Sequence, residues 1–325
     1  MSRFIIRRVL LIVPLLIGIT MLTFGIANLV PGSPLADLEY NLQRNRELTP
    51  EQIERIKHNL GLNQPMHVRY LVWLSNVARG DLGMSIRSHA PVTQMILDRL
   101  PNTLLLTTTA FLLSLLFAVP VGVYAAVHRN SWFDRATTAT AVAAYSAPTF
   151  WLALLLILLL AVKFQQWGLP SLPAGGTYDL RHGGGFWDRV EHLILPAFTL
   201  AFVQTAYWTR FIRSQMLEVL GQDYVRVARA KGLRERAVVF RHGLRNALLP
   251  LVTLLGLSLP ELFAGAVIIE QIFTWPGMGL LAYSGAINKD YPVIMGTVLF
   301  AAVLVILGNL LADICYSLVD PRVRQ

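Results

Sequence analysis

Six long apolar runs constrain the fold of this chain more than any other feature. A helix needs about 20 residues to cross the hydrocarbon core of a bilayer, and each run is close to that length. Lipid offers no hydrogen-bond partners, so a spanning segment must pair its own backbone groups, which favours helices. Proline lies inside most of the runs, as Pro148 does in the third, and a bundle tolerates the resulting kinks. We predict an all-α polytopic membrane protein with six transmembrane helices at residues 9–30, 103–127, 136–162, 193–212, 247–269 and 292–318.

The composition agrees with a membrane location. Hydrophobic residues make up 54% of the chain and charged residues only 14%. Soluble domains carry about 25% charged residues. The net charge is +9, but the basic residues lie in connections beside apolar runs, so lipid headgroups explain them better than nucleic acid does. The one cysteine, Cys315, lies inside a run, which excludes a disulfide framework and zinc-ligand spacing.

Arginine and lysine predict the orientation. Basic residues precede the first run, lie between the second and third, surround the fourth-to-fifth connection and follow the sixth. Cytoplasmic connections carry an excess of these residues, so both termini are predicted to be cytoplasmic. A basic start followed by an apolar run also fits a cleaved signal peptide. This run is long for a signal peptide and five more follow, which favours an uncleaved anchor.

The long connection after the first run is predicted to be folded and external. Thr49 and Gln52 form a capping box at the start of one helix, and a second helix is predicted over residues 66–78. The stretch 165–191 is rich in glycine and aromatic residues and is predicted to be a loop. The chain then divides into an N-terminal tail with the first transmembrane helix (1–30), an external helical segment (31–99) and a membrane core (100–325) that includes a basic helical connection at about 222–246.

The polar segment 222–250 is unusual because it lies between two apolar runs. Asp223 opens a helical pattern that Gly232 ends, as a C-cap glycine does, and a second helical pattern starts near Arg234. Such a helix pair, presented on one side of a membrane protein, is a docking surface. Small residues such as Ala228 let another backbone approach closely. The alternative is a basic amphipathic helix on anionic lipid.

Several motifs resemble those of a known family. Arg226-Val227-Ala228, followed after three residues by Gly232, resembles the EAA loop of ABC importer permeases, although the acidic first residue and first alanine of that triplet are missing. Further stretches resemble the peptide and nickel branch of the family, in the right order. They are residues 79–85 (RGDLGMS), 223–233, 241–247, 270–279 (EQIFTWPGMG) and 290–292. The chain resembles the B-type permease subunit of a dipeptide or oligopeptide importer.

The resemblance implies a type I ABC importer permease bundle in a bacterial or archaeal cytoplasmic (inner) membrane. It implies a second, homologous C-type permease subunit, two ATP-binding subunits, an external substrate-binding protein and membrane lipid as partners. The chain would hold no cofactor, since ATP and Mg²⁺ belong to the ATPase subunits. The implied ligands are peptides, with nickel chelates, glutathione and haem as alternatives carried by relatives.

The EAA-like segment supplies the candidate coupling residues. Tyr224, Val227 and Ala228 are expected on one helix face, seated in a groove of a cytoplasmic ATPase, with arginines on the other faces. The full set expected to couple to the ATPase is Tyr224, Val227, Ala228, Ala230, Lys231, Gly232 and Leu233.

Ionisable residues in membrane runs are functional candidates, because burying charge in a membrane is costly. Glu261 lies beside a proline and either lines the translocation pathway, where it meets a ligand amine, or pairs with a basic residue. Glu270 is expected near the external membrane surface with a structural role, and Trp275 is expected to be an interfacial anchor. Arg210 is expected to snorkel to headgroups and not to bind a ligand, and Asp313 to pair with an arginine.

The sequence lacks common enzyme motifs. It contains no G-x-x-x-x-G-K-[ST] run, no H-E-x-x-H and no G-x-S-x-G, so it is not predicted to hydrolyse ATP or to be a hydrolase. Two other classes stay open. A secondary transporter would normally hold a coupling-ion site within its own spans. A non-transporting assembly protein would explain the docking helices alone.

Overall fold

The protein is helical throughout the part that the structure describes. The computed structural model describes residues 2–29, 64–179, 184–248 and 266–319, with positions 250, 251, 254, 258 and 262 between the last two ranges. In these residues every regular element is a helix, and the one extended contact is an isolated antiparallel bridge between Met84 and Pro91. The all-α part of the prediction is confirmed for the described residues.

Four helices are much longer than the others. They are α1 (Ser2–Leu29), α5 (Val92–Val127), α9 (Phe186–Leu220) and α15 (Tyr291–Val319). The remaining described elements are α4 (Met66–Ala78), α6 (Trp132–Ser146), α7 (Thr149–Leu156), η1 (Ile157–Lys163), α8 (Phe164–Gln166), α10 (Asp223–Ala230), α11 (Glu235–Ala237), η3 (Val238–Leu244), α13 (Val267–Ile272) and α14 (Met278–Ile287), where η denotes a π-helix.

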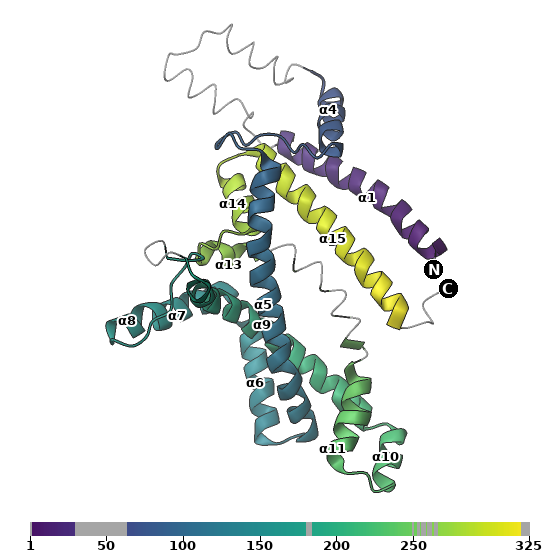
Figure 1. Cartoon of the computed structure of the whole chain (residues 1–325). Coiled ribbons are helices and arrows are strands. Elements are labelled where there is room, and N and C mark those ends of the chain that lie inside the picture. Colours follow the sequence, from purple (N-terminus) through teal and green to yellow (C-terminus); the bar gives the residue numbers. More distant parts are fainter. Residues whose placement is uncertain are drawn as a thin grey trace.

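The core forms where α5 and α9 pack along each other (Figure 1). α6 packs on α9, α14 packs on α5, and α1 packs along α15. One apolar cluster joins α5, α9 and η3, and it includes Ala118, Trp208, Ile212, Met216 and Val239. A second joins α5, α7, α9 and α13 through Leu106, Ala153, Leu195, Ile269 and Phe273.

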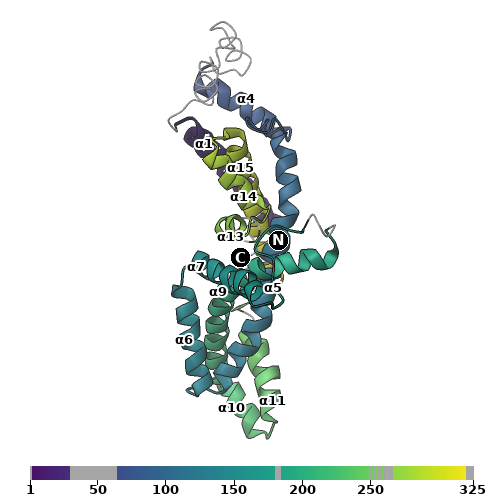
Figure 2. The same cartoon turned by 90° about the vertical axis from the view of Figure 1, so that its left-hand side faces the viewer.

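The short helices α4 and α10–α11 lie at opposite ends of the molecule. α4 is at one end, and α10 and α11 are at the other (Figures 1 and 2). α1 and α15 run antiparallel, so the beginning of α1 and the end of α15 lie at the same end of that pair, away from α4. α9 leads from the core to α10, at the end of the molecule opposite α4 (Figure 1).

Three described helices are long and apolar enough to cross a membrane: Val92–Val127, Thr149–Gln166 and Tyr291–Leu310. Two shorter apolar helices cover Leu10–Gly25 and Met278–Ile287. The expected fourth span, 193–212, lies within α9, which carries charged residues at both ends. The expected fifth span, 247–269, lies largely outside the described residues. The number of six spans therefore stays a prediction.

The third expected span, 136–162, is wrong as a single helix. α6 ends at Ser146, Ala147 adopts extended backbone with ψ 133°, and α7 starts after Pro148. Proline lacks an N–H and disfavours helical backbone in the residue before it. The helix is therefore interrupted at this position, where only a kink was expected. The loop expected at 165–191 is also too long, because helices reach Gln166 and resume at Phe186.

The external segment is described from residue 64 onward. The helix predicted over 66–78 is confirmed as α4, whereas the capping box at Thr49 and Gln52 lies outside the described residues. α4 is held to α1 by an aromatic cluster of Phe24, Tyr70 and Trp73, with ring centroids 5.5–6.3 Å apart. The Tyr70 hydroxyl also lies 2.9 Å from Thr20 Oγ1. These contacts attach the segment to the membrane helices.

The corner where α5 meets α13 and α14 corrects two expectations. Glu270 is 0% exposed, and its carboxylate accepts hydrogen bonds from Thr103 Oγ1 (3.0 Å) and from the Leu280 N–H (2.9 Å). It lies in α13, so the expected surface position is wrong, although its role in the fold is structural. Trp275 is 1% exposed and its Nε1–H donates to the Asn102 carbonyl at 2.9 Å, so it is a core residue and not an interfacial anchor.

Candidate functional site: the surface of α10, α11 and η3

α10 forms where the sequence predicts it and ends as predicted. Gln222 precedes the helix in extended backbone, and Asp223 places a negative charge in the first turn, where the helix dipole favours it. Gly232 has φ +75°, the left-handed conformation that a side chain disfavours. Its N–H donates to the Arg229 carbonyl at 2.9 Å. The glycine therefore ends the helix and turns the chain toward α11, which starts after Arg234 as expected.

One face of α10 packs against its own chain. Val225 is 0% exposed and Ala228 is 6% exposed, and both contact Val238 of η3, with Leu220 of α9 beside them. This corrects the expected placement of Ala228, which lies on the inward face and not with Tyr224 and Val227. Its small side chain allows α10 to approach η3, so the close approach occurs within the chain.

A neighbouring face of α10 is open and partly apolar. Tyr224 is 43% exposed, Val227 is 52% exposed and Leu233 is 44% exposed, and Phe240 of η3 is 54% exposed. Three other expected coupling residues, Ala230, Lys231 and Gly232, are also exposed. Large apolar side chains exposed on a polar helix pair make it a candidate interaction surface. The docking surface is defined here as Tyr224, Val227, Ala230, Lys231, Gly232, Leu233 and Phe240.

Charged side chains hold the two short helices together beside this surface. Arg229 donates to both carboxylate oxygens of Glu235, with Nε–Oε2 at 3.1 Å and Nη2–Oε1 at 2.7 Å. The hydrogen bonds from Arg229 lower the pKa of the Glu235 carboxyl below its ordinary range. The Asn246 amide donates to the Tyr224 hydroxyl at 3.0 Å. Exposed basic residues surround the surface: Arg226, Arg234, Arg236, Arg241 and Arg245.

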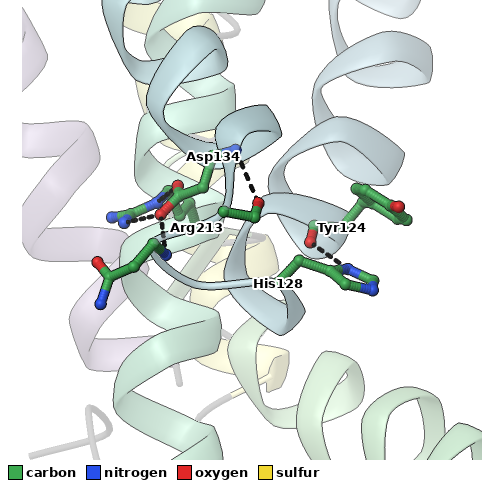
Figure 3. A network of polar contacts seen from close by, with 6 residues as sticks. Tyr124, His128, Asp134 and Arg213 are labelled. Atoms are coloured by element: carbon green, nitrogen blue, oxygen red, sulfur yellow. Dashed lines mark hydrogen bonds and ion pairs between the residues drawn. The ribbon is translucent and has the colours of Figure 1, made fainter.

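A polar network joins α6 to α9 near the end of α9 that leads to α10 (Figure 3). Asp134, 3% exposed at the start of α6, pairs with Arg213 of α9 through two hydrogen bonds, one of them 2.8 Å from Nη2 to Oδ2. The Asn130 N–H donates to Asp134 Oδ2 at 2.9 Å, and Ser131 caps α6 by accepting from the Asp134 N–H. α6 and α9 are thereby joined two turns before α9 ends at α10.

Sequence reasoning missed this ion pair because its members are 79 residues apart. Ser131 followed by Asp134 was the local signal, since Ser is a preferred N-cap and an acid fits the first turn. Glu261, the expected pathway residue, lies outside the described residues. Among the described residues, no cluster of three His, Cys, Asp or Glu side chains could hold a metal ion.

The geometry defines a class: a polytopic helical membrane protein with an exposed helix pair at one end (Figure 1). The chain matches the binding-protein-dependent transport system inner membrane component family over residues 118–325. It matches the N-terminal part of the same membrane components over residues 1–107. The chain belongs to this family of transport permeases.

Similar proteins extend over the full length of the chain. It is 46% identical over 325 residues to the oligopeptide transport system permease protein AppB of Bacillus subtilis, covering 100% of both chains. It is 40% identical over 345 residues to the dipeptide transport system permease protein DppB of Escherichia coli, covering 100% of this chain and 99% of that one. A di/tripeptide permease protein, DppB of Pseudomonas aeruginosa, is 40% identical over 343 residues.

Proposed function

We propose that this chain is the B-type permease subunit of an ATP-driven importer for peptides and forms half of the translocation pathway. The observation that carries the proposal is the docking surface, an exposed apolar face with a basic rim at one end of a membrane bundle of this family. The relatives named for oligopeptides and dipeptides support peptides as the ligand class. Nickel chelates, glutathione and haem stay alternatives.

The proposed partners follow from the parts that an importer needs. A second, homologous permease subunit would complete the pathway, two ATP-binding subunits would meet the docking surface, and an external binding protein would deliver the ligand. ATP and Mg²⁺ would be bound by the ATPase subunits. In this arrangement the chain itself is not an enzyme.

The proposed topology has six spans, with both termini on the cytoplasmic side of a bacterial or archaeal inner membrane. Two features support it. α4 and the docking surface lie at opposite ends of the molecule, and the basic residues gather around the docking surface, as expected for the cytoplasmic side.

The long helix α9 supplies a route from the docking surface to the core. Its 35 residues extend about 50 Å at 1.5 Å per residue. α10 is packed on η3, and η3 is packed on α9, where Gly243 lies against Met216 and Leu220. A movement of an ATPase against α10 would move the end of α9, and the Asp134–Arg213 pair would carry that movement to α6.

Glu261 stays a proposed pathway residue on the sequence argument alone. Glu261→Gln is expected to reduce transport while the subunits still assemble. Normal transport by this variant, or failure of the variant to assemble with the other subunits, would contradict a role of Glu261 in the pathway.

The proposal is tested by co-expressing the chain with the ATPase subunits and purifying by a tag on the chain. The ATPases are expected to co-purify, and their turnover is expected to require the chain and to rise with ligand-loaded binding protein. A secondary transporter would carry ligand without the ATPases. An assembly protein would bind partners without ligand-dependent turnover. Either result would contradict the proposal.

A further inference from the structure

Two cavities open beside α9 and adjoin each other. The larger, of about 630 Å³, lies among α5, α6, α9 and the described positions of the expected fifth span, and Gln204 is in its wall. The smaller, of about 410 Å³, lies between α6 and α9 and contains Arg210. Tyr145 and Tyr207 line both cavities. The two therefore form one cleft with a tyrosine pair between its halves.

The larger cavity contains an unsatisfied hydrogen-bond acceptor. Gln204 Oε1 is buried, and no described group donates to it. Buried polar atoms in proteins nearly always have a partner, and an unmade hydrogen bond is costly. The other described side chains of this cavity are aromatic, aliphatic or hydroxyl-bearing, and none of them is charged. A ligand that brings an N–H donor into this half of the cleft would satisfy the oxygen.

The smaller cavity contains a cation that no described carboxylate pairs with. Arg210 is exposed, whereas Arg213, three residues further along α9, is committed to Asp134. A guanidinium binds a carboxylate through two parallel hydrogen bonds, which makes arginine the residue of choice for that group. Tyr207 lies beside Arg210 in the same cavity. This half of the cleft therefore suits a carboxylate.

The spacing of these groups sets a ligand length. Gln204 and Arg210 are six residues apart on α9, about 9 Å along the helix axis. An extended chain rises 3.3–3.6 Å per residue, so this distance corresponds to roughly two or three residues of peptide. The tyrosine rings between the two positions offer faces against which side chains of many kinds can pack.

We propose that this cleft binds a short extended peptide during translocation. The terminal carboxylate of the peptide pairs with Arg210, and one of its N–H groups donates a hydrogen bond to Gln204 Oε1. The inference rests on the proposed function, which supplies the ligand class, and adds the direction in which the peptide lies along α9. The described side chains of the larger cavity carry no charge and leave room for varied ligand side chains. A lipid chain and a segment of the second permease subunit are the other occupants that the test distinguishes.

The test is photo-crosslinking in the assembled importer in proteoliposomes, with radiolabelled trialanine as the probe. Tyr207→p-benzoylphenylalanine keeps an aromatic group at the junction of the cavities. Light during transport is expected to label this chain, and excess unlabelled trialanine is expected to prevent the labelling. The control is Phe198→p-benzoylphenylalanine, at a 43% exposed position of α9 outside both cavities, which is expected to stay unlabelled.

Two further substitutions in the Tyr207 photoprobe background test the assigned groups. Gln204→Leu and Arg210→Gln are each expected to lower trialanine labelling about tenfold per assembled complex, the loss of one strong hydrogen bond. Gln215→Leu, a half-buried glutamine on the same helix outside the cleft, is expected to leave labelling unchanged.

Each other outcome overturns part of the account. The importer could carry trialanine while position 207 crosslinks to lipid or to the second permease subunit and not to trialanine. That result would overturn the cleft assignment. Unchanged labelling in both cleft variants would overturn it as well. If the unsubstituted importer does not carry trialanine, the proposed function itself fails and this inference falls with it.

Discussion

The docking surface and the corner around Glu270 each contain a hydrogen-bonded glutamate, exposed beside the docking surface and buried at the corner. Beside the docking surface, Arg229 and Glu235 are six residues apart, and their side chains stay 42% and 56% exposed. At the corner, the Glu270 carboxylate is fully buried, and one of its partners, Thr103, is 167 residues away in the sequence. The first region leaves its paired charges in contact with solvent, whereas the second buries its carboxylate in the fold. Substitutions should therefore affect binding at the docking surface and stability at the corner.

The largest expected loss of stability follows Glu270→Ala. The substitution leaves the Thr103 hydroxyl and the Leu280 N–H without their shared acceptor and opens a void, which should cost about 3 kcal/mol. Thermal unfolding of the purified protein in detergent measures the loss. Glu191→Ala, at an exposed acid of α9, is the control and should change little. Equal unfolding temperatures for the two variants would remove the distinction between the regions.

A smaller loss is expected for Asp134→Ala. Removing one member of a buried ion pair costs about 3–5 kcal/mol, but Arg213 keeps 26% of its side chain exposed, so we expect about 2 kcal/mol. Since this pair joins α6 to α9, ligand-stimulated ATP turnover should also fall. Asp98→Ala, at an exposed acid of α5, is the matched control. Turnover equal to that of the control would show that the pair only stabilises the fold.

The smallest expected effect is a pH dependence at the docking surface. Arg229 lowers the pKa of Glu235 from its ordinary value of 4.5. A carboxyl whose pKa is lower in the folded state stabilises that state above the unfolded pKa, and the stabilisation is lost as the pH falls through the folded pKa. Because both side chains are exposed, the free energy of unfolding of the wild type should exceed that of Glu235→Gln by less than about 1 kcal/mol at pH 7. The difference should disappear in acid, and one that stays constant down to about pH 3 would contradict the pairing.

Local signals predicted the docking region well. Asp223, Gly232 and Arg234 bound the helices as expected, and α4 has the predicted ends, since caps and glycine conformations are decided within a few residues. The face of α10 that packs inward was not predictable in the same way. Periodicity separates the two faces of a helix, but which face meets η3 depends on tertiary packing, and Ala228 was misplaced for that reason.

Contacts between distant parts of the chain were not predicted. The sequence shows Glu270 and Trp275 beside an apolar run, where a surface position is reasonable, but their partners Thr103 and Asn102 come from α5. Pro148 fits a kink or a break equally well in sequence, and the packing of α6 on α9 accompanies the break. The cleft along α9 is lined by four separate segments of the chain, so no single motif marks it.

The central claim is that the docking surface meets an ATPase, and Val227→Arg tests it most directly. Ala228→Arg is less informative, because Ala228 is buried and the change would disturb α10 itself. Val227 is 52% exposed, as is Val72 of α4 at the opposite end of the molecule, so Val72→Arg is the matched control.

The measurement is recovery of the ATPase subunits with the tagged permease. For Val227→Arg we expect recovery at least about tenfold below that of Val72→Arg, because a cation placed in an apolar interface stays unpaired. If α10 lies on lipid instead, the added cation would be harmless or would strengthen membrane association. Equal ATPase recovery with both variants would contradict the account.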